Sequence, residues 1–184
     1  MQLLKIYYAY FSPGNTTEKV VSHIASSFQN YPVESINLTD YATRQEDYYF
    51  KENELLIIGV PAYGGRVPAP VVDALRHFTG SNTPVVLVAT YGNRDIDDTL
   101  IELKKNVIDK GFIPVGAASF VCQHTFLKEC AEGRPDEEDL KMAREFGDKL
   151  KERLRLLVTY DAGDLEVPGT FPYTKQPMGE FPFK

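Results

Sequence analysis

The strongest constraint on the fold comes from three short apolar runs, at residues 3–10, 54–61 and 84–90, each followed at once by a loop. Runs of this length with few polar residues are typical of parallel strands that are buried on both faces of a sheet. Two weaker strand patterns lie at residues 32–38 and 112–121. One alternates apolar and polar residues and the other contains a proline, and both features are typical of strands near a sheet edge.

Each predicted strand is followed by a segment with a helical pattern. In the third helix, Asp95 is the expected N-cap, with Asp97 and Asp98 in the first turn, where the helix dipole favours acids. The second is expected to start at a proline, which the first turn tolerates. Apolar residues recur every three or four positions in the segments 16–28, 68–79, 95–110 and 135–155, and the polar segment 39–53 is expected to hold a short, irregular helix.

Five strands alternating with helices predict an α/β fold, a three-layer doubly wound five-stranded parallel sheet with helices on both faces. Right-handed connections favour the strand order 2-1-3-4-5, in which a ligand binds outside the carboxyl ends of the first and third strands. We expect residues 1–158 to form one domain. The proline-rich residues 159–184 are expected to form an extension that wraps along the domain, reaches a partner or stays partly mobile.

The composition argues against several classes of function. A formal net charge of −6 argues against nucleic acid as the main partner and against an anionic membrane surface. No apolar run approaches the roughly 20 residues of a membrane-spanning helix, and no signal peptide precedes the first strand, so we expect a cytoplasmic protein. The two cysteines, Cys122 and Cys130, are too few for a four-iron cluster. We expect free thiols, with a disulfide as the alternative.

The loop at residues 11–18 joins the first strand to the first helix and has the composition of a phosphate site. Free backbone N–H groups and the positive end of the helix dipole meet at such a junction. The loop has no Lys or Arg and neither common nucleotide-binding glycine motif, so neutral donors would hold the phosphate. The alternative is an ordinary capped turn without a ligand. The candidate phosphate-binding residues are Ser12, Pro13, Gly14, Asn15, Thr16 and Thr17.

The loops after the third and fourth strands are expected to converge on the same end of the sheet, and each has a tyrosine beside glycine. Glycine lets the backbone approach a flat ring closely, and tyrosine provides a stacking face. Phosphate donors together with stacking tyrosines describe a site for flavin mononucleotide (FMN). The candidate contacts in these two loops are Pro61, Ala62, Tyr63, Gly64, Gly65 and Arg66, and Thr90, Tyr91, Gly92, Asn93, Arg94 and Asp95.

One of the three histidines, His124, follows the fifth strand and is therefore expected at the ligand end of the sheet. There it could donate a hydrogen bond to the flavin or shuttle a proton, or it could be an ordinary loop residue. His23 lies in the first helical pattern and is expected to be exposed, and His77 lies late in its helix, where a cation suits the dipole. Arg66 and Arg94 could contact the edge of the flavin or simply face solvent.

Three stretches of the chain, 11–20, 61–68 and 91–94, resemble the flavodoxin-like half of flavodoxin–ferredoxin fusion proteins. Ser12 and Thr17 match the two ends of the flavodoxin phosphate loop, Ser/Thr-x-Thr-Gly-x-Thr, although its interior differs here. The similarity runs over residues 5–155, and no cysteine run of a ferredoxin domain follows. The resemblance implies that residues 1–158 are a flavodoxin-like domain with FMN as cofactor.

The resemblance also implies electron transfer between FMN and a redox partner protein, such as a ferredoxin or another iron–sulfur protein. In this reading the flavin carries one or two electrons and the protein sets its potential, with no catalytic nucleophile, general base or metal site. One alternative is an NAD(P)H-dependent FMN reductase or quinone reductase, which shares the fold. A second alternative is a flavin-free scaffold of the same fold.

Overall fold

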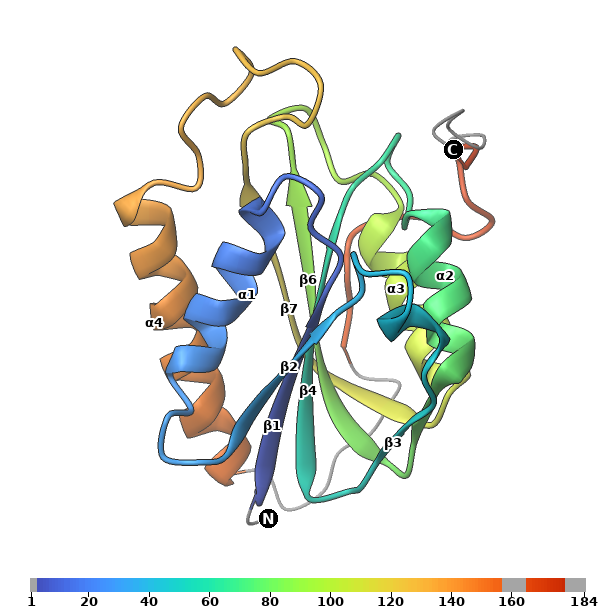
Figure 1. Cartoon of the computed structure of the whole chain (residues 1–184), viewed down its shortest axis with the longest axis vertical. Coiled ribbons are helices and arrows are strands. Elements are labelled where there is room, and N and C mark those ends of the chain that lie inside the picture. Colours follow the sequence, from blue (N-terminus) through green and yellow to red (C-terminus); the bar gives the residue numbers. More distant parts are fainter. Residues whose placement is uncertain (1–2, 157–164, 178–184) are drawn as a thin grey trace.

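A computed structural model describes residues 3–156 and 165–177 of the chain (Figure 1). Its centre is a five-stranded parallel sheet made of β1 (Lys5–Tyr10), β2 (Val33–Asn37), β4 (Glu54–Pro61), β6 (Thr83–Tyr91) and β7 (Phe112–Val121). The strands lie in the order β2-β1-β4-β6-β7. When only these five are counted along the chain, the order is 2-1-3-4-5, in agreement with the expected doubly wound sheet.

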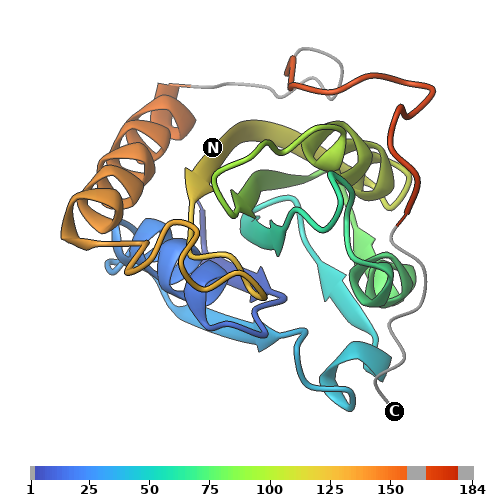
Figure 2. The same ribbon diagram turned by 90° about the horizontal axis from the view of Figure 1, so that it is seen from above.

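Two pairs of helices cover the two faces of this sheet, which gives three layers (Figures 1 and 2). A core on each face joins the helices to the sheet, and β4 and β6 contribute buried side chains to both cores. The apolar runs of β4 and β6 are therefore explained by burial on both faces. Helices α1 (Thr16–Ser26) and α4 (Glu137–Leu156) cover one face, and α2 (Ala69–Ala74) and α3 (Thr99–Ile108) cover the other.

The structure differs from the sequence prediction in two segments that form a second, two-stranded parallel sheet. The expected irregular helix in 39–53 is a short 3-10 turn, η1 (Thr43–Gln45), followed by β3 (Tyr48–Phe50). The predicted helix 68–79 is shorter, because after α2 and the 3-10 turn η2 (Leu75–His77) the chain extends into β5 (Phe78–Gly80).

An aromatic cluster explains this correction. The ring centroids of Phe78 and Tyr48 lie 5.1 Å apart, and those of Phe78 and Phe50 lie 5.3 Å apart. Phe50 also packs against Phe112 at 5.4 Å. Packing these large rings favours the extended conformation, and such tertiary contacts override the local helical pattern.

The start of α3 is a second correction. Asp95 was the expected N-cap, but α3 begins at Thr99. The Asp95 carboxylate instead accepts the N–H groups of Ile96 (2.7 Å) and Asp97 (3.2 Å), which closes a local turn. Asp97 then adopts a left-handed backbone, with φ 42°. The carboxylate of Asp98 instead accepts hydrogen bonds from Thr170, Thr174 and Lys175, near the C-terminal end of the chain.

Residues 165–177, which we call the C-terminal strap, lie along α3 (red in Figures 1 and 2). Lys104 Nζ donates a hydrogen bond to the carbonyl of Leu165 (2.7 Å), and Lys105 Nζ lies 3.7 Å from the ring centroid of Phe171. Of the three alternatives for the extension, this stretch shows the one in which it wraps along the domain. The rest of the expected extension, at 159–164 and 178–184, lies outside the described residues. Within the described residues, no helix combines the length and the apolar character that crossing a membrane requires.

The close approach of α4 to α1 yields a stability prediction at Gly147. A Cβ at this position would lie 2.6 Å from the carbonyl oxygen of Ile24 and 2.7 Å from Ser27 Oγ. Gly147→Ala gains up to about 1 kcal/mol of helix propensity, but the clash with fixed backbone should outweigh it. We expect a net destabilisation of about 1–3 kcal/mol in urea unfolding. Asp148→Ala, at the exposed next position, is the control and should change stability by less than about 0.5 kcal/mol. Equal effects of the two substitutions would contradict the proposed close packing.

Candidate functional site

The loop between β1 and α1 presents backbone donors at the carboxyl end of the sheet. Asn15 has a left-handed backbone (φ 59°) and precedes the first helical residue. The N–H of Glu18 donates to Ser12 Oγ (3.0 Å), so Ser12 caps the first turn. The N–H groups of Thr16 and Thr17 have no acceptor within the helix, and no hydrogen bond among the described residues uses them. These two N–H groups are free to bind an anion at the positive end of the helix dipole.

Two hydroxyl groups that were predicted to bind phosphate have structural partners instead. Thr17 Oγ1 lies 2.7 Å from Thr90 Oγ1, and both residues are about 1% exposed. This contact ties the start of α1 to the end of β6. The side chain of Ser12 is used by the helix cap, and its backbone N–H donates to Thr39 Oγ1 (2.8 Å). The N–H groups of Thr16 and Thr17 are therefore donors of this loop that have no partner among the described residues.

A pocket lies where the carboxyl ends of β4, β6 and β7 meet the start of α1. Its cavity volume is about 90 Å³, and it is open to solvent. Sites that bury most of a ligand enclose about 300–1,000 Å³, so a flavin here would lie partly in solvent. The pocket brings together the predicted residues Thr16, Pro61, Ala62, Tyr63, Gly64, Thr90, Tyr91, Gly92 and His124, and adds Cys122, Gln123, Thr125 and Phe126.

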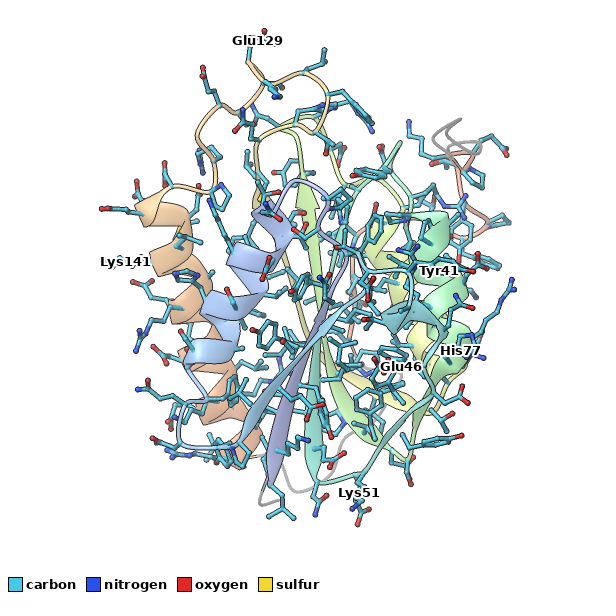
Figure 3. All side chains as sticks on the ribbon, viewed as in Figure 1. Tyr41, Glu46, Lys51, His77, Glu129 and Lys141 are labelled. Carbon is cyan, nitrogen blue, oxygen red and sulfur yellow. The ribbon has the colours of Figure 1, made fainter. Side chains whose placement is uncertain are left out.

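The added residues belong to the loop 122–134 after β7, in which the sequence predicts only His124 as a candidate contact. The loop 122–134 lies at the pocket because β7, which precedes it, pairs with β6 through Tyr91 and Val121. Cys122 N–H then donates to the carbonyl of Tyr91 (2.8 Å) and extends this pairing into the pocket. The predicted strand order places the fifth strand beside the fourth, and this neighbourhood could have identified the residues after the fifth strand as part of the pocket. The tip of the loop carries Glu129, which points away from the domain (Figure 3).

His124 is held against the loop after β6. A Cβ on Gly92 would lie 2.5 Å from His124 Cδ2, so only glycine allows the ring to pack so closely. His124 Nδ1 accepts the N–H groups of Phe126 (3.1 Å) and Leu127 (3.0 Å). The neutral ring therefore carries its proton on Nε2. No hydrogen bond among the described residues uses Nε2, which leaves it able to donate to a ligand.

The two tyrosine side chains line the pocket from the loop after β4 and from the end of β6. Tyr63 packs edge-to-face on Phe11, with ring centroids 6.4 Å apart, and its hydroxyl lies 3.4 Å from Thr125 Oγ1. Tyr91 is partly exposed at the end of β6. The two side chains provide aromatic surface around the pocket, as expected for a site that holds a flat ring.

Several other predicted contacts do not line the pocket. Arg66 is buried (7% exposed), and its Nε and Nη2 donate to Glu102 at 2.7 Å and 2.6 Å. Its guanidinium is thus a structural group, which corrects the proposed flavin contact. Arg94 is exposed and forms an ion pair with Asp97. The remaining residues outside the pocket lining are Ser12, Pro13, Gly14, Asn15, Thr17, Gly65, Asn93 and Asp95.

The cysteine in the pocket wall is not a reactive thiol. Cys122 and Cys130 are both free, and Cys122 is 2% exposed. Burial raises the pKa of the Cys122 thiol to about 12, so the group stays protonated at neutral pH. Cys130 Sγ donates to the carbonyl of Gly92 (3.2 Å) and fixes the far end of the loop 122–134. Both thiols therefore serve to shape the pocket.

Solved structures with a similar fold include flavodoxins. A flavodoxin from the domain Archaea matches with a TM-score of 0.57 and 14% identity, over 83% of this chain and 99% of its own. Oxidised Flavodoxin 2 from Bacillus cereus gives 0.56 and 16%, over 81% and 99%. A mutant flavodoxin of Fusobacterium nucleatum bound to flavin mononucleotide gives 0.55 and 15%, over 83% and 98%. Neither models of protein families nor curated protein sequences give a match. The protein therefore has the flavodoxin-like fold, and its function must be argued from the site.

The buried hydroxyl pair at the rear of the site yields a second prediction. Thr17→Val should leave Thr90 Oγ1 buried without a partner and destabilise the protein by about 1–3 kcal/mol in urea unfolding. Thr17→Val with Thr90→Val removes both groups, and the double variant should be more stable than the sum of the two single changes predicts. Additive effects would show that the two hydroxyls do not bind each other.

Proposed function

We propose that this protein binds FMN at the pocket and transfers electrons between the flavin and an iron–sulfur partner protein. The observation that carries the proposal is the free pair of first-turn N–H groups, at Thr16 and Thr17, beside a pocket lined by two tyrosines. Such N–H groups bind phosphate, and the tyrosines suit a flat ring. The flavodoxin-like fold supports the choice, since one structural neighbour is bound to FMN.

The residues present fit an FMN molecule in a specific way. The N–H groups of Thr16 and Thr17 and the Thr16 hydroxyl would hold the phosphate, with neutral donors only. Tyr63 and Tyr91 would contact the ring, and His124 Nε2 could donate a hydrogen bond to it. Bound FMN would supply the electron transfer itself, while the chain binds, orients and partly covers the flavin.

Charge around the site favours a low reduction potential. The chain has a formal net charge of −6, and Glu18, which accepts a hydrogen bond from Tyr10 (3.0 Å), lies in the first turn of α1. Negative charge near the site disfavours an added electron on the ring. Each 59 mV of a one-electron potential corresponds to about 1.4 kcal/mol, so a modest field has a measurable effect.

Partial exposure of the ring suits exchange of electrons with another protein. The pocket is open and small, so an edge of the flavin would stay accessible at the carboxyl end of the sheet. An iron–sulfur protein such as a ferredoxin is the partner that we propose. An NAD(P)H-dependent reductase would instead need room for nicotinamide over the ring.

The phosphate assignment predicts a preference for FMN over riboflavin. In fluorescence-quenching titrations we expect FMN to bind at least about tenfold more tightly, because charge-assisted hydrogen bonds to the phosphate add affinity. Thr16→Val should weaken FMN binding several-fold and leave riboflavin binding unchanged. Thr79→Val, at an exposed position on β5, is the matched control and should change neither. Equal affinities for FMN and riboflavin would rule out the phosphate site, and no uptake of FMN would favour a flavin-free scaffold.

The electron-transfer assignment predicts which reductants act on the flavin. In stopped-flow mixing of the FMN-loaded protein, a reduced ferredoxin should bleach the flavin within the mixing experiment, whereas NADH and NADPH should react slowly. Fast direct bleaching by either nicotinamide would instead identify a reductase. The same protein without FMN controls for absorbance changes of the ferredoxin itself.

A further inference from the structure

The C-terminal strap contacts both loops that carry the pocket tyrosines. Its Lys175 carbonyl accepts a hydrogen bond from Arg66 Nη1 (2.7 Å), in the loop between β4 and α2. Its Lys175 Nζ lies 3.5 Å from Asp97 Oδ1, in the loop between β6 and α3. The two loops are joined to each other where Asp98 N–H donates to the carbonyl of Gly65 (2.9 Å). The strap therefore joins these two loops, which follow directly on the pocket-lining residues 62–64 and 91–92.

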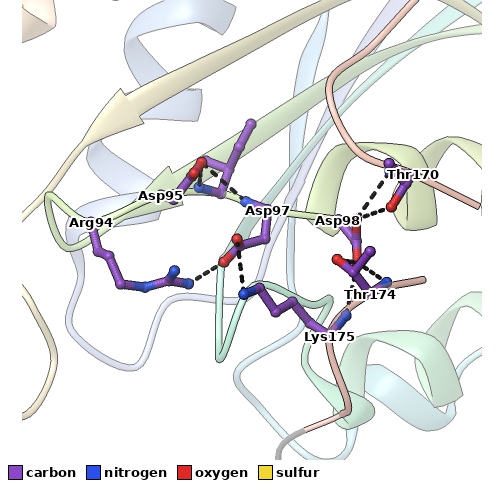
Figure 4. A network of polar contacts seen from close by, with 8 residues as sticks. Arg94, Asp95, Asp97, Asp98, Thr170, Thr174 and Lys175 are labelled. Atoms are coloured by element: carbon purple, nitrogen blue, oxygen red, sulfur yellow. Dashed lines mark hydrogen bonds and ion pairs between the residues drawn. The ribbon is translucent and has the colours of Figure 1, made fainter.

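Asp98 is the centre of this connection (Figure 4). It is 2% exposed, and its Oδ1 accepts the N–H of Thr170 (3.0 Å) and the Thr170 hydroxyl (3.2 Å). Its Oδ2 accepts the N–H groups of Thr174 (2.6 Å) and Lys175 (3.0 Å) and the Thr174 hydroxyl (2.9 Å). Every one of these five donors comes from the strap. A buried carboxylate with such partners fixes the strap in one place.

Arg66 provides the second attachment. Its guanidinium lies 4.1 Å from the ring centroid of Tyr173, which is cation–π contact with the strap. Glu102 holds the other side of the guanidinium and also accepts the N–H of Val67 (2.8 Å). One side chain thus joins the pocket loop, α3 and the strap. Loss of the strap would leave part of this buried cation without its partners.

We propose that the C-terminal strap positions the loops 62–67 and 92–98 for the flavin, with Asp98 as the positioning residue. The proposal rests on FMN binding at the pocket. Docking of the strap and binding of FMN then favour each other, and by linkage each stabilises the other to the same extent. The strap is a separate segment of chain, so its docking is an equilibrium that single substitutions can shift.

Docking of the strap should depend on pH. Burial alone would raise the pKa of Asp98, but the hydrogen bonds from the strap outweigh it and hold this pKa below its usual range. A carboxyl with a lowered pKa stabilises the docked state above about pH 3.9, and this stabilisation is lost as the pH falls further. Charged groups around Asp98 are Arg66, Asp97, Glu102 and Lys175. Because other carboxylates lie near Asp98, its contribution is isolated with a variant.

The test is hydrogen exchange on the full chain, with and without FMN, for the wild type, Asp98→Asn and Asp109→Asn. The amide of Asn is a poor substitute for a carboxylate that accepts five hydrogen bonds. We expect Asp98→Asn to speed exchange of the strap amides at least about tenfold.

In the same variant, exchange in the loops 62–67 and 92–98 should also become faster. The FMN dissociation constant should rise several-fold, and the pH dependence of strap exchange near pH 4 should disappear. Asp109→Asn removes the same charge at an exposed position at the end of α3 and should match the wild type. In the wild type, FMN should slow exchange of the strap.

Two results would overturn the inference. Either the strap amides stay protected in Asp98→Asn, or they exchange freely while both loops and FMN affinity stay unchanged, which would make the strap merely structural. Thr170→Val with Thr174→Val, which removes two hydroxyl donors from the strap side, repeats the test if Asp98→Asn does not fold. If the wild type binds no FMN, the proposed function fails, and exchange in the two loops still decides whether the strap holds them in place.

Discussion

Burial of the central strands on both faces of the sheet is the constraint on which the rest of the structure depends. Residues 83–90 of β6 are all buried, and so are residues 54–60 of β4. Two apolar faces require two layers of helices, and the right-handed connections that provide them bring the strand ends together at one edge. The loops at that edge contribute only a few side chains to the core, among them Phe11, Val67 and Ile96. They can therefore carry the tyrosines, the histidine and the free N–H groups of the site.

At this edge of the sheet, side-chain hydroxyls bind within the protein, whereas two backbone N–H groups of the first helical turn do not bind within the described part of the chain. Ser12, Thr17 and Thr90 use their hydroxyls to fix the loop between β1 and α1, and the N–H groups of Thr16 and Thr17 have no partner among the described residues. This division explains how the loop can depart from the usual flavodoxin pattern at Gly14 and Asn15. Its free N–H groups result from helix geometry, which depends less on the identity of the side chains.

The C-terminal strap gives the two neighbouring loops a structural role, because residues of both loops bond to it. Arg66 and Asp98, which the sequence predicts as a candidate ligand contact and an acid in the first turn of a helix, are both buried and bonded to residues 165–177. Their charges are compensated by Glu102 and by donors from the strap, as buried charges require. The partners of these two residues thus lie more than seventy residues further along the chain.

The sequence by itself determined the α/β class, the strand order and the convergence of three loops, because hydrophobic periodicity and connection handedness are properties of local segments. It also placed Tyr63, Tyr91 and His124 at one end of the sheet. It did not determine the strands β3 and β5, since packing of Phe78 among other aromatic rings overrides the helical pattern. Only the tertiary structure decided the partners of Thr17, Arg66 and Asp98. A polar side chain can equally well bind a ligand, face solvent or contact a distant segment. Which of these occurs depends on the chain segments that the fold brings within hydrogen-bonding distance.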